Sequence, residues 1–536
     1  MCGISGIVTA DGPAEAAELE RMTSLVAYRG PDDHGYLGFS SRTGAVRFTR
    51  DAGELGPGDG RSYDLLLGHR RLAILDLSEQ GRCPMPSADG KLWITYNGEV
   101  YNYLELRAEL ASLGHRFSTG TDTEVILAAY REWGTACLER FNGMWAFALL
   151  DIEKSLLFCA RDRLGVKPFY YHWDGGTFSF GSEIKQLLCL PRVGSEAHSG
   201  VLFDFLVFST YGCNSEQTFF RDVQDLRGGH YLLVPLGALQ GWSPRPVRWW
   251  GIDLRHKLEG WSDRQYADRY RELFEDAVRL RLRSDVPVGS CLSGGLDSSG
   301  IVCVVDRLLK QAGIADRQKT FTSVSDNPRF DEREYAQAVI DATRVQPSFV
   351  NPSPERLLAD LDRLMWHQDE PFISTSIFAG WCVYGLAREQ GVTVTLDGQG
   401  PDEMLGGYVP TMYPALLVDN LAGLSLGTAL ANLRGLNARR GLSYGQMARD
   451  VTRALGAGML PRALMPSIRR ARRLLSPEFL AEGMAQSIVL KRIAGYPDWK
   501  REVGGTPFDR ELLEATLYDS LPGILRQVDR NSMAFS

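Results

Sequence analysis

The sequence Ser293-Gly294-Gly295-Leu296-Asp297-Ser298-Ser299 lies between a short apolar segment, residues 286–292, and a stretch with helical periodicity. A strand that turns through glycines into a helix directs several backbone N–H groups and the positive helix end toward one point. Such a turn binds anions, and glycine lets a phosphate group come close. A tight turn without a ligand is the alternative, but the serines on both sides favour a phosphate site.

The carboxylate of Asp297 falls in the first turn of the expected helix. It would repel a phosphate unless a cation bridged the two groups, so the motif predicts a divalent metal ion. The sequence contains no Gly-x-x-x-x-Gly-Lys-Ser/Thr run, which excludes the ordinary Walker-type loop as a competing interpretation.

Strands and helices are expected to alternate around this motif. That order indicates a parallel sheet with helices on its faces, whose ligands bind beyond the carboxyl ends of the strands. A second glycine-rich motif, 396–403 (Leu-Asp-Gly-Gln-Gly-Pro-Asp-Glu), follows a later strand, so we expect both motifs to share one site. The periodicity predicts strands at 320–324 and 392–396, and helices at 265–283, 332–342, 355–366 and 376–390.

The composition is that of an ordinary globular chain of 536 residues, enough for about three domains or two large ones. A net charge of −7 argues against a nucleic-acid partner, because phosphate neutralisation needs a basic face. The nine cysteines include no Cys-x-x-Cys pair, which argues against a zinc site or a disulfide scaffold and suits a reducing compartment. With no apolar run of membrane-span length and no signal-peptide pattern, we expect a cytoplasmic protein without a membrane partner.

The chain begins Met1-Cys2-Gly3, and removal of Met1 would make Cys2 the first residue. Its thiol would then lie beside a free α-amino group, whose ordinary pKa is about 7.7–8.0. Such an amine can act as general base for the neighbouring nucleophile. The alternative is that Cys2 is a small buried apolar residue.

Six further segments carry polar residues at turns or strand ends, and each alone is typical of a turn or a helix cap. They are 28–32 (Tyr-Arg-Gly-Pro-Asp), 68–76 (Gly-His-Arg-Arg-Leu-Ala-Ile-Leu-Asp), 93–102 (Trp-Ile-Thr-Tyr-Asn-Gly-Glu-Val-Tyr-Asn), 119–124 (Thr-Gly-Thr-Asp-Thr-Glu), 141–149 and 161–171. Together with Cys2 they resemble the N-terminal-cysteine glutaminase domain of class II glutamine amidotransferases. The two glycine-rich motifs narrow the resemblance to the glutamine-hydrolysing asparagine synthetase family, over nearly the whole chain.

The resemblance implies two folds in one chain: an N-terminal αββα sandwich of the Ntn-hydrolase type (α+β), and a parallel-sheet α/β ATP-pyrophosphatase domain. It places the glutaminase domain at 1–190, a connection at 191–261 and the synthetase domain at 262–536. We expect residues 223–234 to form a hairpin that bridges the domains. In the family the segment 529–536 runs on into further helices, so we expect the given sequence to stop short of the end of that domain.

The resemblance also implies the machinery that would hydrolyse glutamine. Cys2 would be the nucleophile, and the Asn97 side chain with the Gly98 N–H would form the oxyanion hole, where donors meet developing negative charge. The backbone of four residues would line the same pocket: Leu72, Ala73, Ile74 and Leu75.

Charged residues would hold the two ends of the glutamine. Arg71 would bind its α-carboxylate, a pairing suited to a guanidinium fork, and Asp122 with help from Glu99 would bind its α-ammonium. This agrees with the chemistry, because zwitterionic glutamine needs one fixed cation and one fixed anion.

In the second domain the resemblance implies an ATP site at which aspartate is activated as an acyl-adenylate. Asp297 and Asp402 would hold Mg²⁺. Ammonia released at Cys2 would reach the adenylate through a dry internal passage and give an amide, AMP and pyrophosphate. The implied ATP-binding residues are Cys291, Ser293, Gly294, Gly295, Leu296, Asp297, Ser298, Ser299, Ser323, Asp397 and Gly398.

The second glycine-rich loop departs from the family pattern at two positions. The family has an acidic residue where this chain has Gln399, and a serine where it has Asp397. Because glutamine cannot act as a base, the identity of the amidated acid stays open. One alternative is an asparagine-synthetase-like amidotransferase or a lactam-forming enzyme that acts on another carboxylate, although an intact Cys2 pocket argues against enzymes that use an internal amine. A nitrogen-sensing protein without ligase turnover is a third interpretation.

The expected partners are small molecules: glutamine, ATP and aspartate. The resemblance leaves a homodimer open. The helical sequence after residue 414 contains a cluster of arginines that matches no motif: Arg469, Arg470, Arg472 and Arg473. The simpler interpretation is a basic helix face in contact with solvent, and the other is a binding site for an acidic partner or substrate.

Overall fold

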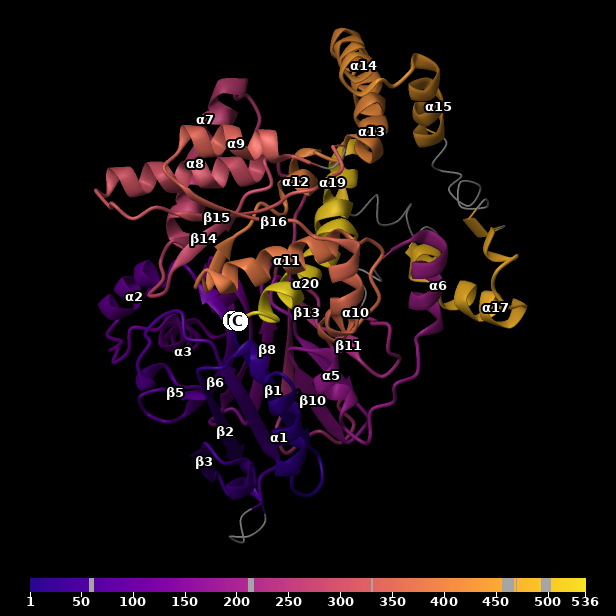
Figure 1. The fold of residues 1–536 in the computed structure, drawn as a ribbon. Helices are drawn as coiled ribbons and strands as arrows, with labels where there is room; N and C mark the ends of the chain where they lie inside the picture. Colours follow the sequence, from indigo (N-terminus) through magenta and orange to yellow (C-terminus); the bar gives the residue numbers. More distant parts are fainter. Residues whose placement is uncertain (57–61, 211–215, 329–330, 456–466, 469, 493–502) are drawn as a thin grey trace.

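The structure is a computed structural model, and it describes residues 1–56, 62–210, 216–328, 331–455, 467–468, 470–492 and 503–536. Two layered bodies make up these ranges (Figure 1): a sandwich of two antiparallel sheets below, and a smaller parallel sheet with helices above it. Within the described ranges, no helix has the length and apolarity needed to span a membrane.

Both sheets of the sandwich are antiparallel throughout. The first has the strand order β11-β9-β10-β1-β4-β2-β3, and the second has the order β13-β12-β8-β7-β6-β5. The strands of the first sheet are β1 (Gly3–Thr9), β2 (Asp33–Phe39), β3 (Val46–Thr49), β4 (Leu65–Arg71), β9 (Tyr170–Trp173), β10 (Thr177–Gly181) and β11 (Gln224–Asp225). Those of the second are β5 (Met85–Pro86), β6 (Leu92–Val100), β7 (Gly143–Asp151), β8 (Leu156–Arg161), β12 (His230–Pro235) and β13 (Val247–Arg248).

Three apolar cores hold the sandwich together. One lies between the sheets and joins Ile4 and Leu67 of the first sheet to Ala148 of the second. A second lies between the first sheet and the helices α1 (Ala16–Leu25) and α5 (Ile184–Leu188). The third lies between the second sheet and the helices α2 (Tyr103–Ser112), α3 (Asp122–Trp133) and α4 (Cys137–Arg140). Helix, sheet, sheet and helix therefore follow in that order, and the expected αββα sandwich is confirmed.

The hairpin expected at 223–234 is wrong. β11 pairs with β9 in the first sheet, whereas β12 pairs with β8 in the second, so this segment crosses from one sheet to the other. Leu226, Leu232 and Val234 are buried in the core between the sheets, which explains why the chain crosses here. Both sheets thus gain strands from beyond residue 190, as far as Arg248.

The C-terminal body contains a four-stranded parallel sheet in the order β16-β15-β14-β17. The predicted alternation of strands and helices is confirmed. The sequence missed β16, whose Gln-Pro-Ser-Phe-Val suits the edge position that proline tolerates. The elements are β14 (Val288–Cys291), β15 (Lys319–Ser323), β16 (Gln346–Val350), β17 (Val394–Leu396), α7 (Asp263–Arg281), α8 (Leu296–Gln311), α9 (Arg333–Ala342), α10 (Pro354–Gln368), α11 (Ser376–Glu389) and α12 (Pro401–Leu405).

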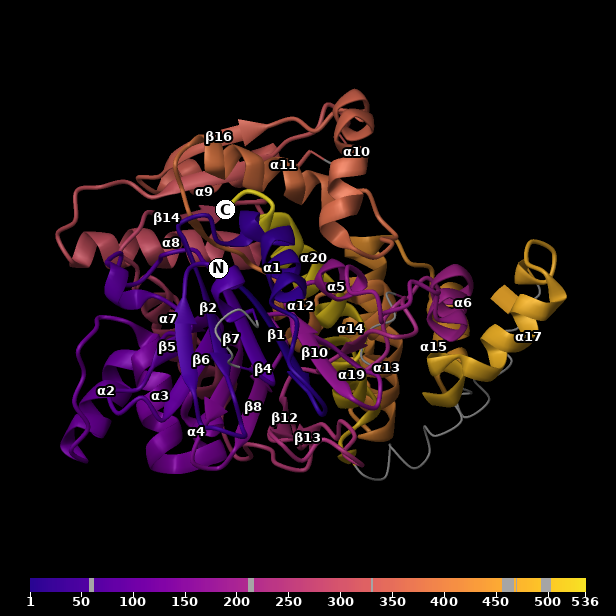
Figure 2. The same ribbon diagram turned by 90° about the horizontal axis from the view of Figure 1, so that it is seen from below.

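Further helices lie around these sheets, among them α13 (Val409–Ala422), α14 (Leu426–Arg440) and α15 (Tyr444–Leu455), which project from the body (Figure 1). Of the arginine cluster, Arg469 lies outside the described residues and the other three members are exposed. The last helix runs between the two bodies and brings the end of the chain close to its beginning (Figure 2), where Met533 packs on Met1. The remaining helices are α6 (Ser199–Phe208), α17 (Pro477–Gln486), α19 (Pro507–Leu517) and α20 (Ser520–Met533).

Candidate functional site

A pocket opens at the start of β1, where Cys2 lies beside the ends of β4 and β6 and the beginning of α3. Eight of the ten residues predicted for the glutamine site line it; Asn97 is buried beside it, and the Ala73 N–H is donated to Asp32 instead. The lining residues are Met1, Cys2, His69, Arg71, Leu72, Ile74, Leu75, Gly81, Cys83, Tyr96, Gly98, Glu99, Thr121, Asp122 and Thr123.

The Cys2 thiol faces the backbone of the 72–75 segment, with its Sγ 3.9 Å from the carbonyl oxygen of Leu72. Burial raises the pKa of this thiol above its ordinary value, so it keeps its proton at neutral pH and needs a base to become a nucleophile. The α-amino group of Met1 lies close by, and burial lowers its pKa to about 5. An amine at this position is therefore neutral at pH 7 and free to accept a proton. Removal of Met1 stays a prediction.

Arg71 presents a fixed positive charge to the pocket. Its guanidinium donates to the carbonyl oxygen of Ser78 at 2.8 Å and also to that of Asp76. A Cβ at Gly81 would lie 2.0 Å from Nη2, so only glycine leaves room for this arrangement. Arg71 forms no ion pair with any described residue. Its charge is held by neutral carbonyls and remains available to an incoming carboxylate.

Two carboxyl groups lie on the other side of the pocket. Asp122, at the start of α3, accepts hydrogen bonds from Tyr96 Oη at 2.7 Å and from the Val100 N–H at 2.8 Å. Burial, and then the charge of Asp122, raise the pKa of Glu99 to about 8. The Glu99 Oε1 has no hydrogen-bond partner among the described residues. Neither carboxyl forms an ion pair with another residue of the described ranges, so the two groups suit an ammonium ligand.

The oxyanion-hole candidates lie on β6. The side-chain amide of Asn97 is fully buried, and neither its Nδ2 nor its Oδ1 has a partner in the described part of the chain. A buried amide without hydrogen-bond partners destabilises the fold unless a ligand forms those hydrogen bonds. Gly98 lies against β7, since a Cβ there would be 2.5 Å from the Cα of Trp145. Position 98 of β6 is therefore restricted to glycine by packing against β7.

The raised pKa of Glu99 predicts a pH-dependent stability. For an acid whose pKa is higher in the folded state, the stabilising contribution is fully present below the ordinary value of 4.5 and is lost as the pH rises through about 8. We expect Glu99→Gln to be more stable than the parent at pH 8.5 by a few kcal/mol, at about 1.36 kcal/mol per unit of pKa, and similar to it at pH 4.5. Urea unfolding at both pH values measures this. The control is Glu79→Gln at an exposed position, and an equal effect of both variants would contradict the prediction.

The second site lies at the carboxyl ends of the parallel strands. β14 and β17 are neighbours, and a Cβ at Gly398 would lie 2.8 Å from the Ser298 nitrogen, so the two glycine-rich motifs are packed against each other. The hydroxyls of Ser293 and Ser298 are hydrogen-bonded at 3.1 Å within the first turn. Gly294 and Gly295 precede α8 and Ser299 lies in its first turn. Cys291 ends β14 and Ser323 ends β15, whereas Leu296 is 92 % exposed.

Asp297 at the start of α8 and Asp402 at the start of α12 are the two carboxylates predicted for a metal. Burial, and then the charge of Asp402, raise the pKa of Asp297 above its ordinary value. The described residues contain no group of three or more potential protein ligands for a metal. Two carboxylates nevertheless fit Mg²⁺, which binds through one or two carboxylates and completes its octahedron with substrate phosphates and water. Asp397 accepts a hydrogen bond from the Tyr384 hydroxyl, and its Oδ1 has no partner in the described ranges.

A cavity of about 630 Å³ is lined by residues from both sites. Met1, Ile74 and Glu99, which also line the Cys2 pocket, line it together with residues of the second site, namely Asp297, Asp397, Gly398 and Gln399. Its walls are mostly apolar, with Met144 of the sandwich, Val394 of the parallel sheet and Leu525 of α20 among them. The sequence could not reveal it, because each wall comes from a different part of the chain and no local pattern marks the residues.

Comparison with known proteins adds two family matches. Residues 53–249 match the family of the glutamine amidotransferase domain, and residues 269–536 match the asparagine synthase family.

Named relatives agree with these matches. A Methanocaldococcus jannaschii protein provisionally assigned as a glutamine-hydrolysing asparagine synthetase is 35% identical, over 76% of this chain and 76% of its own. Glutamine-hydrolysing asparagine synthetases 3 and 1 of Bacillus subtilis are 31% and 30% identical over 76% of this chain. The chain spans only 63% and 59% of the length of these two relatives.

Proposed function

Because the chain belongs to the glutamine-hydrolysing asparagine synthetase family, we propose that it is an ATP-dependent ligase that moves the amide nitrogen of glutamine to the side-chain carboxylate of aspartate. The products are asparagine, glutamate, AMP and pyrophosphate. The observation that carries the proposal is the apolar cavity lined by residues of both the Cys2 pocket and the two-aspartate site.

In the first half-reaction the Cys2 thiolate attacks the side-chain amide of glutamine. The α-amino group of the mature N-terminus takes the thiol proton, and the supporting observation is that burial keeps the Met1 amine beside Cys2 neutral at pH 7, with its lone pair free. The side-chain amide of Asn97 and the N–H of Gly98 stabilise the oxyanion, and the unpartnered buried amide supports this role. Arg71 and Asp122, with Glu99, hold the two charged ends of the substrate.

In the second half-reaction the backbone of residues 293–299 binds the phosphates of ATP, and Asp297 and Asp402 hold Mg²⁺. The metal supplies charge neutralisation on the phosphates when bound. The carboxylate of the acceptor attacks the α-phosphorus, pyrophosphate leaves, and ammonia then displaces AMP from the acyl-adenylate. Ammonia must arrive unprotonated to be a nucleophile, and the apolar walls of the cavity favour the neutral form.

The proposal includes the cellular compartment and the oligomeric state of the enzyme. The eight cysteines of the described ranges are all free thiols, which favours the cytoplasm. We also propose that the chain forms a homodimer.

Isotope transfer tests the function directly. The protein is incubated with Mg-ATP, aspartate and glutamine labelled with ¹⁵N in the amide, and asparagine and AMP are measured together by mass spectrometry. We expect labelled asparagine to form in step with AMP. Unlabelled ammonium at a concentration equal to that of glutamine serves as the control for leakage, because an internal passage predicts little dilution of the label.

The loop that contains Asp397 and Gln399 departs from the family pattern. The identity of the acceptor acid is therefore the part of the proposal that this experiment tests most severely. Labelled ammonia and glutamate without asparagine would contradict aspartate as the acceptor while leaving the Cys2 assignment intact. Pyrophosphate exchange with other small carboxylic acids would then identify the acid that replaces it.

A further inference from the structure

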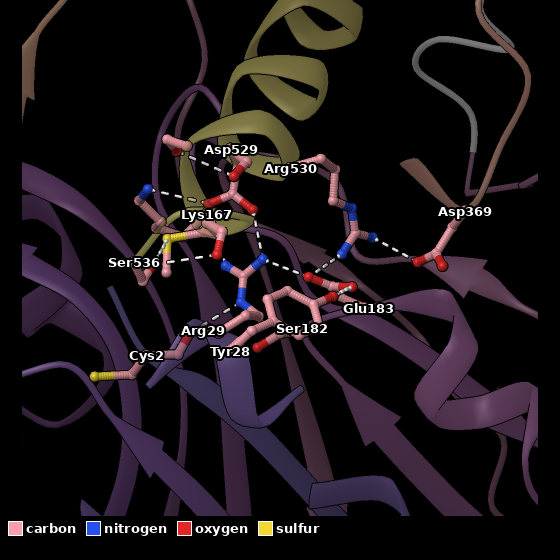
Figure 3. Close-up of polar contacts among 12 residues, drawn as sticks. Cys2, Tyr28, Arg29, Lys167, Ser182, Glu183, Asp369, Asp529, Arg530 and Ser536 are labelled. Carbon is pink, nitrogen blue, oxygen red and sulfur yellow. Dashed lines mark hydrogen bonds and ion pairs between the residues drawn. The ribbon is translucent and has the colours of Figure 1, made fainter. Parts of the chain in front are cut away.

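Seven charged side chains form a buried cluster between the sandwich and the C-terminal body, and six of them are labelled in Figure 3. Ion pairs of 2.8–3.1 Å connect them in one series, and none of the seven side chains is more than 11% exposed. The members, in the order of contact, are Lys167, Asp529, Arg29, Glu183, Arg530, Asp369 and Lys185. Four come from the sandwich and three from the C-terminal body.

Arg29 is the member that reaches the nucleophile. Its Nε donates to the carbonyl oxygen of Cys2 at 3.1 Å, and its Nη1 and Nη2 donate to the Asp529 carboxylate at 2.9 and 3.2 Å. Nη1 also donates to Glu183 at 2.8 Å. Figure 3 shows the guanidinium between the Cys2 backbone and α20. A single planar group thus ties the first residues of β1 to the last helix.

Asp529 holds this guanidinium from the other body. Its carboxylate is buried, and although burial raises its pKa, Arg29 and Lys167 outweigh that effect and lower the pKa to about 2. It is therefore ionised throughout the physiological range. Lys167 donates to the same carboxylate at 3.1 Å, so the group is fixed from two sides. The position of Arg29, and with it the Cys2 carbonyl, depends on a residue that lies 500 positions away in the chain.

We infer that Asp529 is a positioning residue for glutamine hydrolysis: through Arg29 it sets the backbone of the Cys2 nucleophile, so that the cysteine is correctly placed only when α20 is docked on the sandwich. The inference rests on the proposed role of Cys2. Asp529 lies outside the glutamine pocket, and it acts on the nucleophile and not on the bound substrate. It should therefore affect kcat and leave the KM for glutamine nearly unchanged.

A second buried ion pair offers a matched control. Glu370 and Arg526 pair at 2.5 Å, and Glu370 also accepts a hydrogen bond from the Phe219 N–H. Glu370 is as buried as Asp529, and Arg526 lies on the same helix α20. This pair has no contact with Arg29 or Cys2 among its hydrogen bonds and ion pairs in the described structure. Glu370→Gln therefore removes one interfacial charge without touching the connection to the nucleophile.

The experiment measures glutamate release from glutamine without ATP in the full chain, as parent, Asp529→Asn and Glu370→Gln. We expect Asp529→Asn to lower kcat by about 10–100-fold, since misplacing a reacting group by about 1 Å costs up to about 10²-fold. Its KM for glutamine should stay within about twofold, and ammonia-dependent pyrophosphate release should change little. Glu370→Gln should keep the parent kcat. Thermal unfolding of each variant reports how far each charge loss destabilises the chain.

Several outcomes would overturn the inference. They are an unchanged kcat in Asp529→Asn, an equal loss in both variants, and a loss in KM alone. If the parent releases no glutamate, the proposed role of Cys2 fails instead, and the inference falls with it. If Asp529→Asn does not fold, Arg29→Lys provides the second test. A lysine can pair with Glu183 or Asp529 but cannot also reach the Cys2 carbonyl, so kcat should fall in the same way, and an unchanged kcat would contradict us.

Discussion

Replacing Cys2 by alanine is expected to abolish glutamine-dependent amide formation and to leave ammonia-dependent formation intact. The loss in kcat for glutamine hydrolysis should be at least about 10³-fold, because removing the nucleophile of a covalent mechanism removes the whole covalent route. The second site should keep working with added ammonium, since it shares no residue with the Cys2 pocket.

Two assays measure this result: glutamate release from glutamine, and pyrophosphate release with ammonium chloride at a pH near 8, where more ammonia is unprotonated. Cys303→Ala is the control, because this cysteine is exposed on α8, away from the pocket. Loss of both activities in Cys2→Ala with an unchanged unfolding temperature would contradict two separate sites.

Replacing Asp297 by asparagine is expected to impair the ATP-dependent reaction and to leave glutamine hydrolysis intact. ATP-dependent turnover should fall by about 10²-fold or more, because the variant loses one of the two carboxylates that we propose hold Mg²⁺, whose neutralisation of phosphate charge would contribute several kcal/mol. Asp402→Asn should behave in the same way, and the double variant should lose little more than either single one, because the two act on one ion. Glutamine hydrolysis without ATP should be unaffected.

The measurement is pyrophosphate exchange across a series of Mg²⁺ concentrations. In the single variants we expect the half-saturating Mg²⁺ concentration to rise, which a purely structural defect would not produce. Asp316→Asn, at an exposed position after α8, is the control. Normal exchange and an unchanged Mg²⁺ dependence in Asp297→Asn would refute the metal assignment.

Local sequence accounts for much of the architecture. Adjacent residues encode the strand, glycine turn and helix around Ser293, and the apolar periodicity that follows indicates a helix with one buried face. The alternation of strands and helices after it indicates a parallel sheet, because parallel neighbours need crossover connections. Cys2 next to the chain start and the Arg71, Asn97 and Asp122 motifs pointed to one pocket through resemblance, and the structure brings them to the same place.

Other features depended on contacts between distant residues. The segment 223–234 looks like a hairpin because its two apolar stretches flank Gly228-Gly229, yet each stretch pairs in a different sheet. Hairpin pairing is a local choice, whereas β11 and β12 pair with β9 and β8, which end more than 50 residues earlier in the chain. The edge strand β16 was missed for a related reason: it has little apolar pattern and is defined by its pairing with β15.

The sequence by itself determined the two candidate sites of this protein, a cysteine at the chain start and a glycine-rich turn predicted to bind phosphate, since each is encoded in a few neighbouring residues. Only the tertiary structure decided how the two sites are brought together. The apolar cavity is lined by residues from Met1 to Ser536, and the buried cluster joins Arg29 to Asp529, 500 positions away. No local pattern specifies such contacts, because they form only when burial of apolar surface brings α20 against the sandwich.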